Sequence, residues 1–342
     1  MQKLSILSLA VTLMGIASFV YGGGGASQAL RKAVAEHAAG TPLHRVVAFF
    51  QEEKAEPEAE EPATPATPAT TQPSEAAKQL LAAASERLAQ HNAVRADLIE
   101  RVSVGDHSFI AKGSYLQGRD LQMKLSFTLE YGGNQGSLLE VCDGQILWTR
   151  HDIGNQPQIT RRDVRQILEA VRKAGNRPEH ILIGDLGLGG VASLLAAFQT
   201  DLEFSDPQED VIDGRPVYIL QGRWSDAYLT RWGIDKNADR EDLPPLLPEV
   251  AHVVLDKETL FPRRIEFLKR LPERKVRKPM LSLEFVNVVV NPPVSDEDFQ
   301  FIPPDRPTPV DVTNLYLQQL VPSAAQSSPG TSPVPGPQAP PK

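Results

Sequence analysis

The residues with the most obvious chemical potential form a glycine-rich segment in the middle of the chain. Residues 187–192 read GLGGVA, which fits the G-x-G-x-x-A pattern of a dinucleotide-binding loop, and Glu209 follows about twenty residues later. That fingerprint requires a parallel sheet built from strand–helix–strand units, whereas short hairpin patterns surround this segment. We therefore interpret it as a glycine-hinged loop before a helix over residues 191–199, and we predict no cofactor.

Other side chains that serve catalysis or metal binding are scattered along the sequence. The 7 histidines show no H-x-H or H-E-x-x-H spacing, so we predict no metal site. Ser114 follows Lys112 and Gly113 without the G-x-S-x-G pattern of a nucleophile elbow. Asp201 and Glu203 have the spacing of one strand face; two carboxylates can serve a glycosidase, but a solvated strand face explains them more simply. The sequence therefore predicts a protein that is not an enzyme.

The clearest secondary-structure signal among the elements that must position any site is a strand pattern at residues 121–131, LQMKLSFTLEY. Apolar residues occupy every second position and polar residues stand between them, which is typical of a strand with one dry and one wet face. About eleven residues at ~3.3 Å each make a long strand, and this length favours a large curved sheet over a small hairpin. What covers the apolar face of the sheet is then the functional question.

The rest of the central region alternates between strand patterns and a few helices. Ser74 can cap a helix that ends near residue 91, and Thr160 with Asp163 can cap another that Gly175 ends. Ser295 with Asp298 indicates a further short cap, and residues 224–248 are interpreted as an insertion. Further strands are predicted at residues 94–104, 109–116, 138–142, 145–151, 202–205, 216–224, 250–256, 263–269 and 280–290. Because short connections produce antiparallel strands, we predict a mainly β, α+β fold in which a curved antiparallel sheet forms an incomplete barrel with helical lids.

Both ends of the sequence differ from this central region. Residues 1–26 contain one lysine, then an uncharged run, then small residues, which is the layout of a signal peptide that is either cleaved or kept as an N-terminal anchor. We expect a short amphipathic helical segment at 27–51, an acidic and then Pro/Ala/Thr-rich disordered linker at 52–73, the folded domain at 74–320 and a disordered Pro-rich tail at 321–342. These features predict a location in the periplasm or cell envelope.

Composition narrows the function further. The chain has 342 residues of which 41% are hydrophobic, enough for a substantial core, and its net charge of −8 gives no electrostatic footprint for nucleic acid. Cys142 is the only cysteine, so no intrachain disulfide can form and no lipid-modified cysteine follows the signal-like segment. Since Cys142 lies in an apolar run, we expect it to be a small buried core residue.

Four stretches of the chain carry a resemblance to a known family. They are the helix, strand and hairpin pattern at residues 80–116, LEVCDGQILW at 139–148, VVLDKETLFPRRIEFL at 253–268, and the strand, acidic turn and Phe-x-Phe-x-Pro-Pro ending at 281–305. Together they resemble the periplasmic lipoprotein-carrier superfamily of LolA and LolB. The resemblance implies an incomplete antiparallel barrel whose mouth is covered by helices, with a hydrophobic cavity for acyl chains. The long linker and the insertion at 224–248 depart from the small carriers of that family.

The resemblance and the strand alternation lead to a functional hypothesis. We expect an exported carrier that holds the acyl chains of a lipid or lipoprotein between the sheet and the helices; the alternative is a non-enzymatic envelope sensor or scaffold of the same fold that binds a membrane or envelope protein. Arg119 corresponds to the arginine that the family's carriers hold between strand and lid, and it is the expected polar contact. The expected lining, chosen by alternation within each strand, is Leu121, Met123, Leu125, Phe127, Leu129, Trp148, Ile265, Phe267, Leu283 and Phe285.

Overall fold

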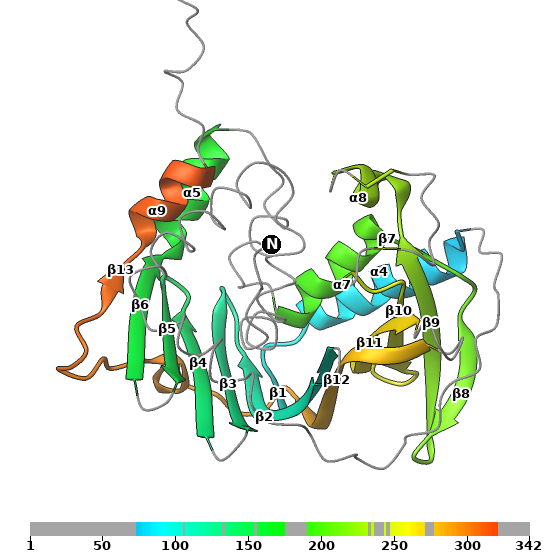
Figure 1. Cartoon of the computed structure of the whole chain (residues 1–342), viewed down its shortest axis with the longest axis horizontal. Helices are drawn as coiled ribbons and strands as arrows, with labels where there is room; N and C mark the ends of the chain where they lie inside the picture. The colour runs from blue at the N-terminus through cyan, green and yellow to red at the C-terminus, as the bar shows by residue number, and fades with distance from the viewer. Residues whose placement is uncertain are drawn as a thin grey trace, which may run out of the picture.

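The computed structural model describes residues 73–320, except for 105–106, 132–133, 154–155, 175–189, 232–233, 236–242, 244–246 and 271–276. Most of this part of the chain belongs to one 13-stranded sheet (Figure 1), with the strand order β13-β6-β5-β4-β3-β2-β1-β12-β11-β10-β9-β7 and with β8 beside β9. The strands are β1 (Val94–Val104), β2 (His107–Gln117), β3 (Gln122–Tyr131), β4 (Asn134–Asp143), β5 (Ile146–Ile153), β6 (Gln156–Asp163), β7 (Leu202–Phe204), β8 (Gln208–Ile212), β9 (Arg215–Trp224), β10 (Val250–Asp256), β11 (Pro262–Arg270), β12 (Arg277–Val290) and β13 (Val310–Asp311).

The sheet consists of two antiparallel series that meet in its middle. Strands β1 to β6 follow one another along the chain and in space, and so, in the other direction, do β9 to β12. The two series are joined because β1 pairs with β12 in antiparallel register, from Val94 opposite Val290 to Val102 opposite Leu281. Only β13 runs parallel to its neighbour, β6, among the pairs that the structure describes. The expected curved antiparallel sheet is therefore confirmed.

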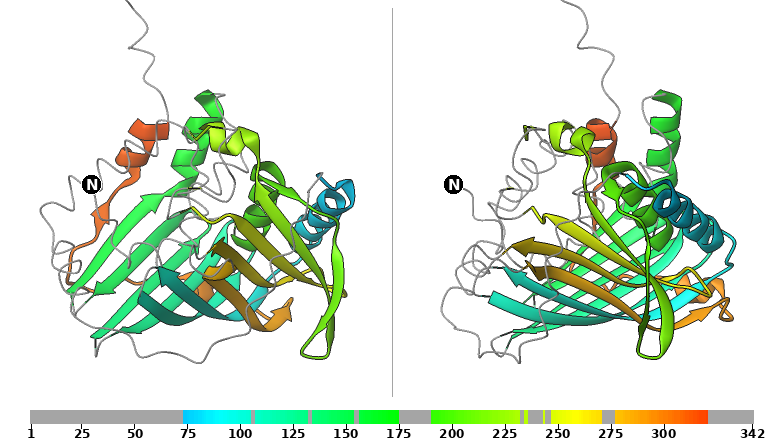
Figure 2. Two further views of the ribbon diagram at one scale, coloured as in Figure 1. Left: turned by 45° about the vertical axis from the view of Figure 1, so that its right-hand side comes forward. Right: turned by 90° about the vertical axis from the view of Figure 1, so that its right-hand side faces the viewer.

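The helices lie on the concave side of this sheet (Figures 1 and 2). Helices α4 (Glu75–Ala89) and α7 (Gly190–Asp201) lie side by side across the half formed by β1 and β9–β12. Helices α5 (Val164–Ala174) and α9 (Thr313–Leu320) pack together at the end of β5 and β6, and the short α8 (Asp226–Arg231) follows β9. None of the described helices has the length and apolar composition needed to cross a membrane.

Local sequence signals explain where the helices begin. The Ala77 N–H donates to Ser74 Oγ at 3.3 Å, so Ser74 caps α4 as predicted. The Gln166 N–H donates to Asp163 Oδ1 at 2.8 Å, so Asp163 caps α5, whereas its predicted partner Thr160 lies in β6. The buried residues of α4 recur at helical spacing and form one apolar stripe, made of Ala77, Leu81, Ala84 and Leu88.

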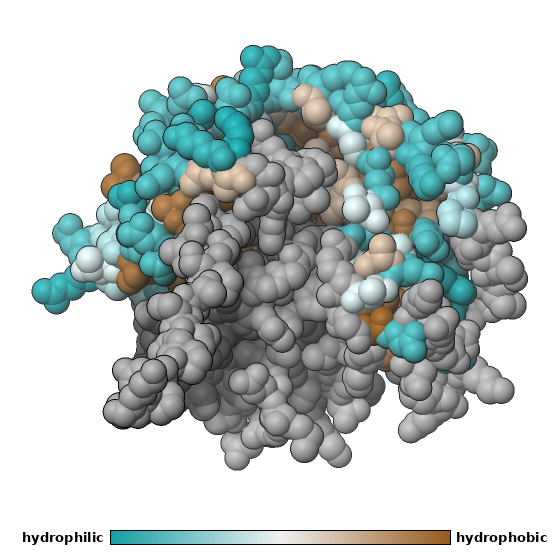
Figure 3. Space-filling view, turned by 90° about the horizontal axis from the view of Figure 1, so that it is seen from above, coloured by the Kyte–Doolittle hydropathy of each residue, from teal (hydrophilic) through white to brown (hydrophobic). Residues whose placement is uncertain are grey.

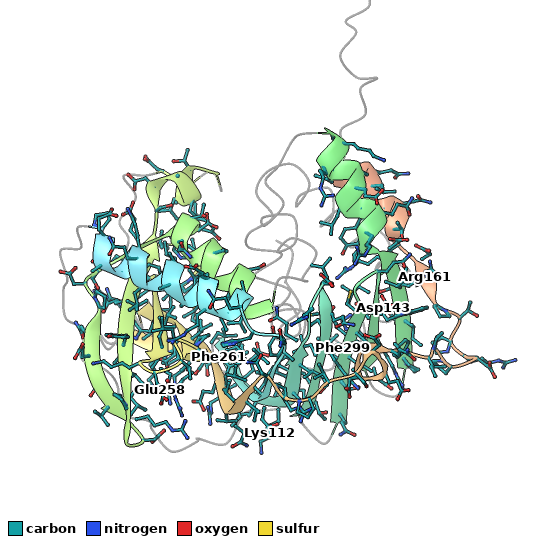
Figure 4. The ribbon with its side chains drawn as sticks, turned by 180° about the vertical axis from the view of Figure 1, so that it is seen from behind. Lys112, Asp143, Arg161, Glu258, Phe261 and Phe299 are labelled. Carbon is teal, nitrogen blue, oxygen red and sulfur yellow. The ribbon has the colours of Figure 1, made fainter. Side chains whose placement is uncertain are left out.

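The C-terminal segment crosses the outer side of the sheet. After β12 the chain makes the 3-10 turn η1 (Asp296–Phe299), in which Ser295 and Asp298 form the capping box that their spacing predicts. It then passes Trp148, whose ring centroid lies 5.4 Å from that of Phe301, before it reaches β13 and α9. Seen from behind, Phe299 lies on this segment where it crosses the strands (Figure 4). The segment connects the middle of the sheet to its β6 edge.

Several expectations concern residues outside the part of the chain that the structure describes. The signal-like segment, the amphipathic segment, residues 52–72 of the linker and the tail all lie there, as do residues 187–189 of the glycine-rich segment. The helix predicted after these glycines is confirmed as α7, whereas β6, β8 and the two-residue β13 are additional strands that the sequence pattern did not predict.

Candidate functional site

We define the inner face as the concave side of the sheet, on which the helices lie. One row of directly opposite residues crosses this face from β9 to β4: Leu220, Val253, Ile265, Leu283, Glu100, Ala111, Leu129 and Gly136. All members of this row are apolar or small except Glu100. The outer face is charged instead, since guanidinium nitrogens of Arg101 and Arg264 lie 3.0 and 3.3 Å from Glu284 Oε1. Figure 4 shows the same contrast, with the exposed Lys112 on the side away from the helices and Phe261 on the helix side.

Most of the predicted lining residues lie on the inner face, where each is at most 6% exposed and belongs to the hydrophobic core. These residues are Met123, Leu125, Phe127, Leu129, Ile265, Leu283 and Phe285. Phe267 is half-buried, and its ring stacks on Trp224 with centroids 6.2 Å apart. Leu121 is half-buried against the core, but it lies in the β2–β3 turn with φ 71° and not in the strand. The structure thus brings together the residues predicted from β3, β11 and β12.

Trp148 lies on the other side of the sheet. It is paired with Val141, whereas its neighbour Leu147 is paired with Cys142, which faces inward with Met123. On the outer face its ring contacts Phe301, and the Arg161 guanidinium lies 5.8 Å from its centroid. Both Leu147 and Trp148 are apolar, so alternation along β5 does not distinguish the two faces. We therefore exclude Trp148 from the inner-face surface.

Arg119, the predicted polar contact, is also placed away from the inner face. It lies exposed in the turn between β2 and β3, and its Nε donates to Asn92 Oδ1 at 3.0 Å. This contact ties the turn to the chain segment that precedes β1. The role expected for Arg119 from the family resemblance therefore remains a prediction, with a structural partner outside the row of apolar residues.

Helix α7 crosses the inner face from β2 to β11. At its beginning the Val191 N–H donates to Tyr115 Oη at 3.3 Å, and towards its end Phe198 meets Phe267 edge to face, with centroids 6.1 Å apart. Gly190 permits this approach, because it has φ 51° and a Cβ at this position would collide with Tyr115 Oη. Helix α7 is therefore positioned by contacts with strands of both series.

Helices α5 and α9 are held at the other end of the inner face. Arg162 of β6 donates through Nη1 to Tyr316 Oη at 2.5 Å, and its guanidinium lies 5.0 Å from the centroid of that ring. Arg165 Nε donates to the Gly144 carbonyl at 2.8 Å, which ties α5 to the β4–β5 turn. The side of α5 that packs on the core is apolar and consists of Val164, Ile167, Leu168 and Val171.

Polar residues occupy the inner face of β4 and β5. Thr149 is buried and donates to Glu140 Oε1 at 3.1 Å, and His151 lies two residues further along β5 on the same side. Burial lowers the pKa of His151, an effect that nearby Glu140 opposes and Arg162 reinforces. The inner face is therefore partly polar on β4 and β5.

Burial also keeps other ionisable groups of the inner face neutral. It raises the pKa of Tyr115 above its ordinary value and that of the Cys142 thiol to about 12, so Cys142 is an unreactive core residue, as its surroundings in the sequence predict. Burial raises the pKa of Glu100 well above its ordinary value. The described residues contain no group of three or more His, Cys, Asp or Glu that could hold a metal ion. The inner face thus combines an apolar surface with a few hydrogen-bonding groups.

Glu100 and Gly136 are inner-face residues that the sequence reasoning missed. The signal for Glu100 is present in the sequence, because it occupies the inward position between Leu98 and Val102 in the alternation of β1. A carboxyl group at an inward position is unusual enough to mark a site. Gly136 is marked by its position opposite Leu129, where an apolar residue is the expected choice.

No protein-family model matches the sequence, and no curated protein sequence matches it significantly. Solved structures do resemble it. MucB has 11% sequence identity and a TM-score of 0.33, and the match covers 67% of this chain and 63% of MucB, so the chain spans less than two thirds of that protein. The lipoprotein LppX from Mycobacterium tuberculosis has 13% identity and a TM-score of 0.34, with 65% of this chain and 99% of LppX covered. A LolA superfamily protein from Nitrosomonas europaea has 12% identity and a TM-score of 0.26, with 67% and 99% covered. The comparisons thus include the superfamily that the sequence motifs resemble, as distant likenesses of structure alone.

Proposed function

We propose that this protein is a non-enzymatic carrier of the periplasm or cell envelope that holds acyl chains of a lipid or lipoprotein between the inner face and the helices. The extent of the apolar inner face is the observation that supports this most. Contacts of α7 reach from Phe267 on β11 to Tyr115 on β2. The row of directly opposite residues continues beyond them to Leu129 on β3 and Gly136 on β4. The apolar surface is therefore wider than these contacts of α7.

The row ends at Gly136, a position that the described residues do not crowd. Among the described residues, a Cβ at position 136 would meet only the Asp152 carbonyl oxygen within 4 Å, at 3.7 Å. Seen from above, parts of the described surface are apolar (Figure 3). An acyl chain needs such an apolar surface and no charged partner.

Binding of this kind would rest on burial of methylene groups, each worth about 0.8 kcal/mol. The buried residues of α7 that approach the sheet are Val191, Leu195 and Phe198, all apolar. An acyl chain that takes the place of such side chains would offer the sheet equivalent contacts. A small displacement of α7 would therefore cost little free energy once the acyl chain is bound.

Displacement of a fluorescent fatty acid tests this function with a matched pair of variants. Gly136→Leu adds a side chain to the inner face, and Ser137→Leu adds the same side chain to the exposed outer face of the same strand. We expect Gly136→Leu to weaken binding at least tenfold, because the new side chain would displace about two methylene groups of the ligand from the sheet. Ser137→Leu should bind like the wild type. Organic extraction of the protein from its native envelope, followed by lipid mass spectrometry, would identify the cargo. Failure to bind the fatty acid or to carry any lipid would instead favour a sensor or scaffold that binds a protein.

A further inference from the structure

Glu100 is a buried carboxylic acid in the centre of the apolar row. It lies opposite Leu283 of β12 on one side and Ala111 of β2 on the other, and Leu98 and Val102 precede and follow it on the inner side of β1. The residue is only 3% exposed. Its place on β1 puts it at the junction of the two strand series, opposite the small side chain of Ala111.

The carboxyl group of Glu100 forms no hydrogen bond or ion pair with any other residue that the structure describes. Burial is the sole cause of its raised pKa, in keeping with the absence of a neighbouring charge. The nearest titratable side chain on the inner face is Tyr115 of β2, whose hydroxyl donates to Gln117. Further away, Thr149 donates to Glu140 and Arg162 donates to Tyr316 on β4–β6, and Lys269 Nζ of β11 lies 3.8 Å from Glu249 Oε1. Burial thus favours the protonated form of Glu100, whose O–H has no acceptor among the residues that the structure describes.

We propose that Glu100 is the polar contact of the ligand, and that its O–H donates a hydrogen bond to the carbonyl group through which an acyl chain joins its head group. This inference rests on the proposed function and adds the point at which the chain is anchored. Every acyl chain ends in a carbonyl, whether as ester, amide or acid, and this group loses its water when the chain enters an apolar site. A single buried donor in an otherwise apolar row satisfies the carbonyl and sets the position of the chain along the sheet.

Competition between two uncharged probes tests the proposal on the full chain. Methyl palmitate carries the acyl carbonyl, and an alkane of matched length lacks it; each competes with a fluorescent fatty acid for the protein. We expect the wild type to prefer the ester by about five- to tenfold, as expected for one buried hydrogen bond. Glu100→Gln keeps a neutral donor and should keep most of the preference, whereas Glu100→Leu should bind both probes equally. The control Arg101→Leu, on the outer side of the same strand, should behave like the wild type.

The outcomes separate this inference from the proposed function. If the wild type binds neither probe, the proposed function itself fails. If it binds both, and Glu100→Leu prefers the ester as strongly as the wild type does, the carrier function stands and Glu100 is not the anchor. Glu100→Leu removes a buried polar group without a partner, so the variant should fold, and circular dichroism with thermal unfolding verifies this.

Discussion

At the scale of single residues, Gly190 determines how α7 meets the sheet. It begins the helix with φ 51°, and a Cβ there would collide with Tyr115 Oη and lie 2.7 Å from Gln117 Oε1. Tyr115 is 1% exposed, and its hydroxyl accepts from Val191 while it donates to Gln117, so it has little freedom to move. The contact between α7 and β2 thus depends on the absence of a side chain at position 190.

The contact between α7 and β2 can be tested by replacing each of two glycines that have positive φ with alanine. Gly214, in the β8–β9 turn, has φ 72°, and no described atom lies within 4 Å of a Cβ placed there. We expect Gly214→Ala to lower the free energy of unfolding by about 1 kcal/mol, the cost of backbone strain alone. Gly190→Ala should lower it by about 2–3 kcal/mol, because the collision with Tyr115 adds to that strain. Urea unfolding measures both, and equal losses would contradict the contact between α7 and Tyr115.

Short-range signals at this scale could be predicted from the sequence, and long-range ones could not. Ser74 and the Ser295–Asp298 pair were recognised because a cap involves residues three positions apart. The role of Glu100 depends instead on which strands lie beside β1, and the partner β12 is almost two hundred residues away in the sequence. No local pattern carries that information.

At the scale of elements, the C-terminal segment covers part of the outer face of the sheet near β3–β5. Its aromatic residues pack where the sheet would otherwise expose apolar side chains, since Phe299 is 1% exposed and Phe301 contacts Trp148. Val141, on the same outer face, is also 1% exposed. Both faces of β4 therefore bear buried apolar residues, and β5 carries the buried Leu147 on one face and the half-buried Trp148 on the other. Alternation alone could not assign Trp148 to a face.

Phe301→Ala tests this assignment. We expect the variant to lower the free energy of unfolding by about 1–2 kcal/mol, because Phe301 is only half-buried and its ring contact with Trp148 is lost. Fatty-acid binding should be unchanged, since the segment lies on the outer face. Unfolding in urea and fluorescence displacement, performed on the same preparation, measure the two effects. A loss of binding without a loss of stability would place Trp148 and Phe301 at the ligand instead.

Many strands were predictable as elements because their apolar residues form a recognisable pattern, alternating in β3 and nearly continuous in β10. The exceptions are informative. β6 reads QPQITRRD and β8 reads QEDVI, sequences with too few apolar residues to show a period of two. They become strands because β5 and β9 provide backbone N–H and C=O groups with which they pair. This is an effect of tertiary structure and not of local propensity.

At the scale of the whole molecule, the pairing of β1 with β12 joins the two strand series into one sheet. Each series alone is a run of adjacent antiparallel strands, and the sequence pattern predicts all of their members except β6. It could not predict that the first and the last long strands pair with each other, because that contact closes the longest loop of the sheet. The apolar row of the inner face exists only because of this pairing.

A single sheet predicts a single unfolding transition, even though its two series could each form a separate core. Leu125 of β3 and Leu220 of β9 lie on opposite sides of the β1–β12 pair and are 1% and 0% exposed. We expect Leu125→Ala and Leu220→Ala each to lower the free energy of unfolding by about 2–4 kcal/mol, with the losses adding in the double variant because the sites share no contact. Circular dichroism and tryptophan fluorescence should give coincident urea transitions for every variant, and the exposed Lys112→Ala should match the wild type. Two separated transitions, each shifted by only one of the substitutions, would mean that the halves fold independently and that the β1–β12 pair does not unite them.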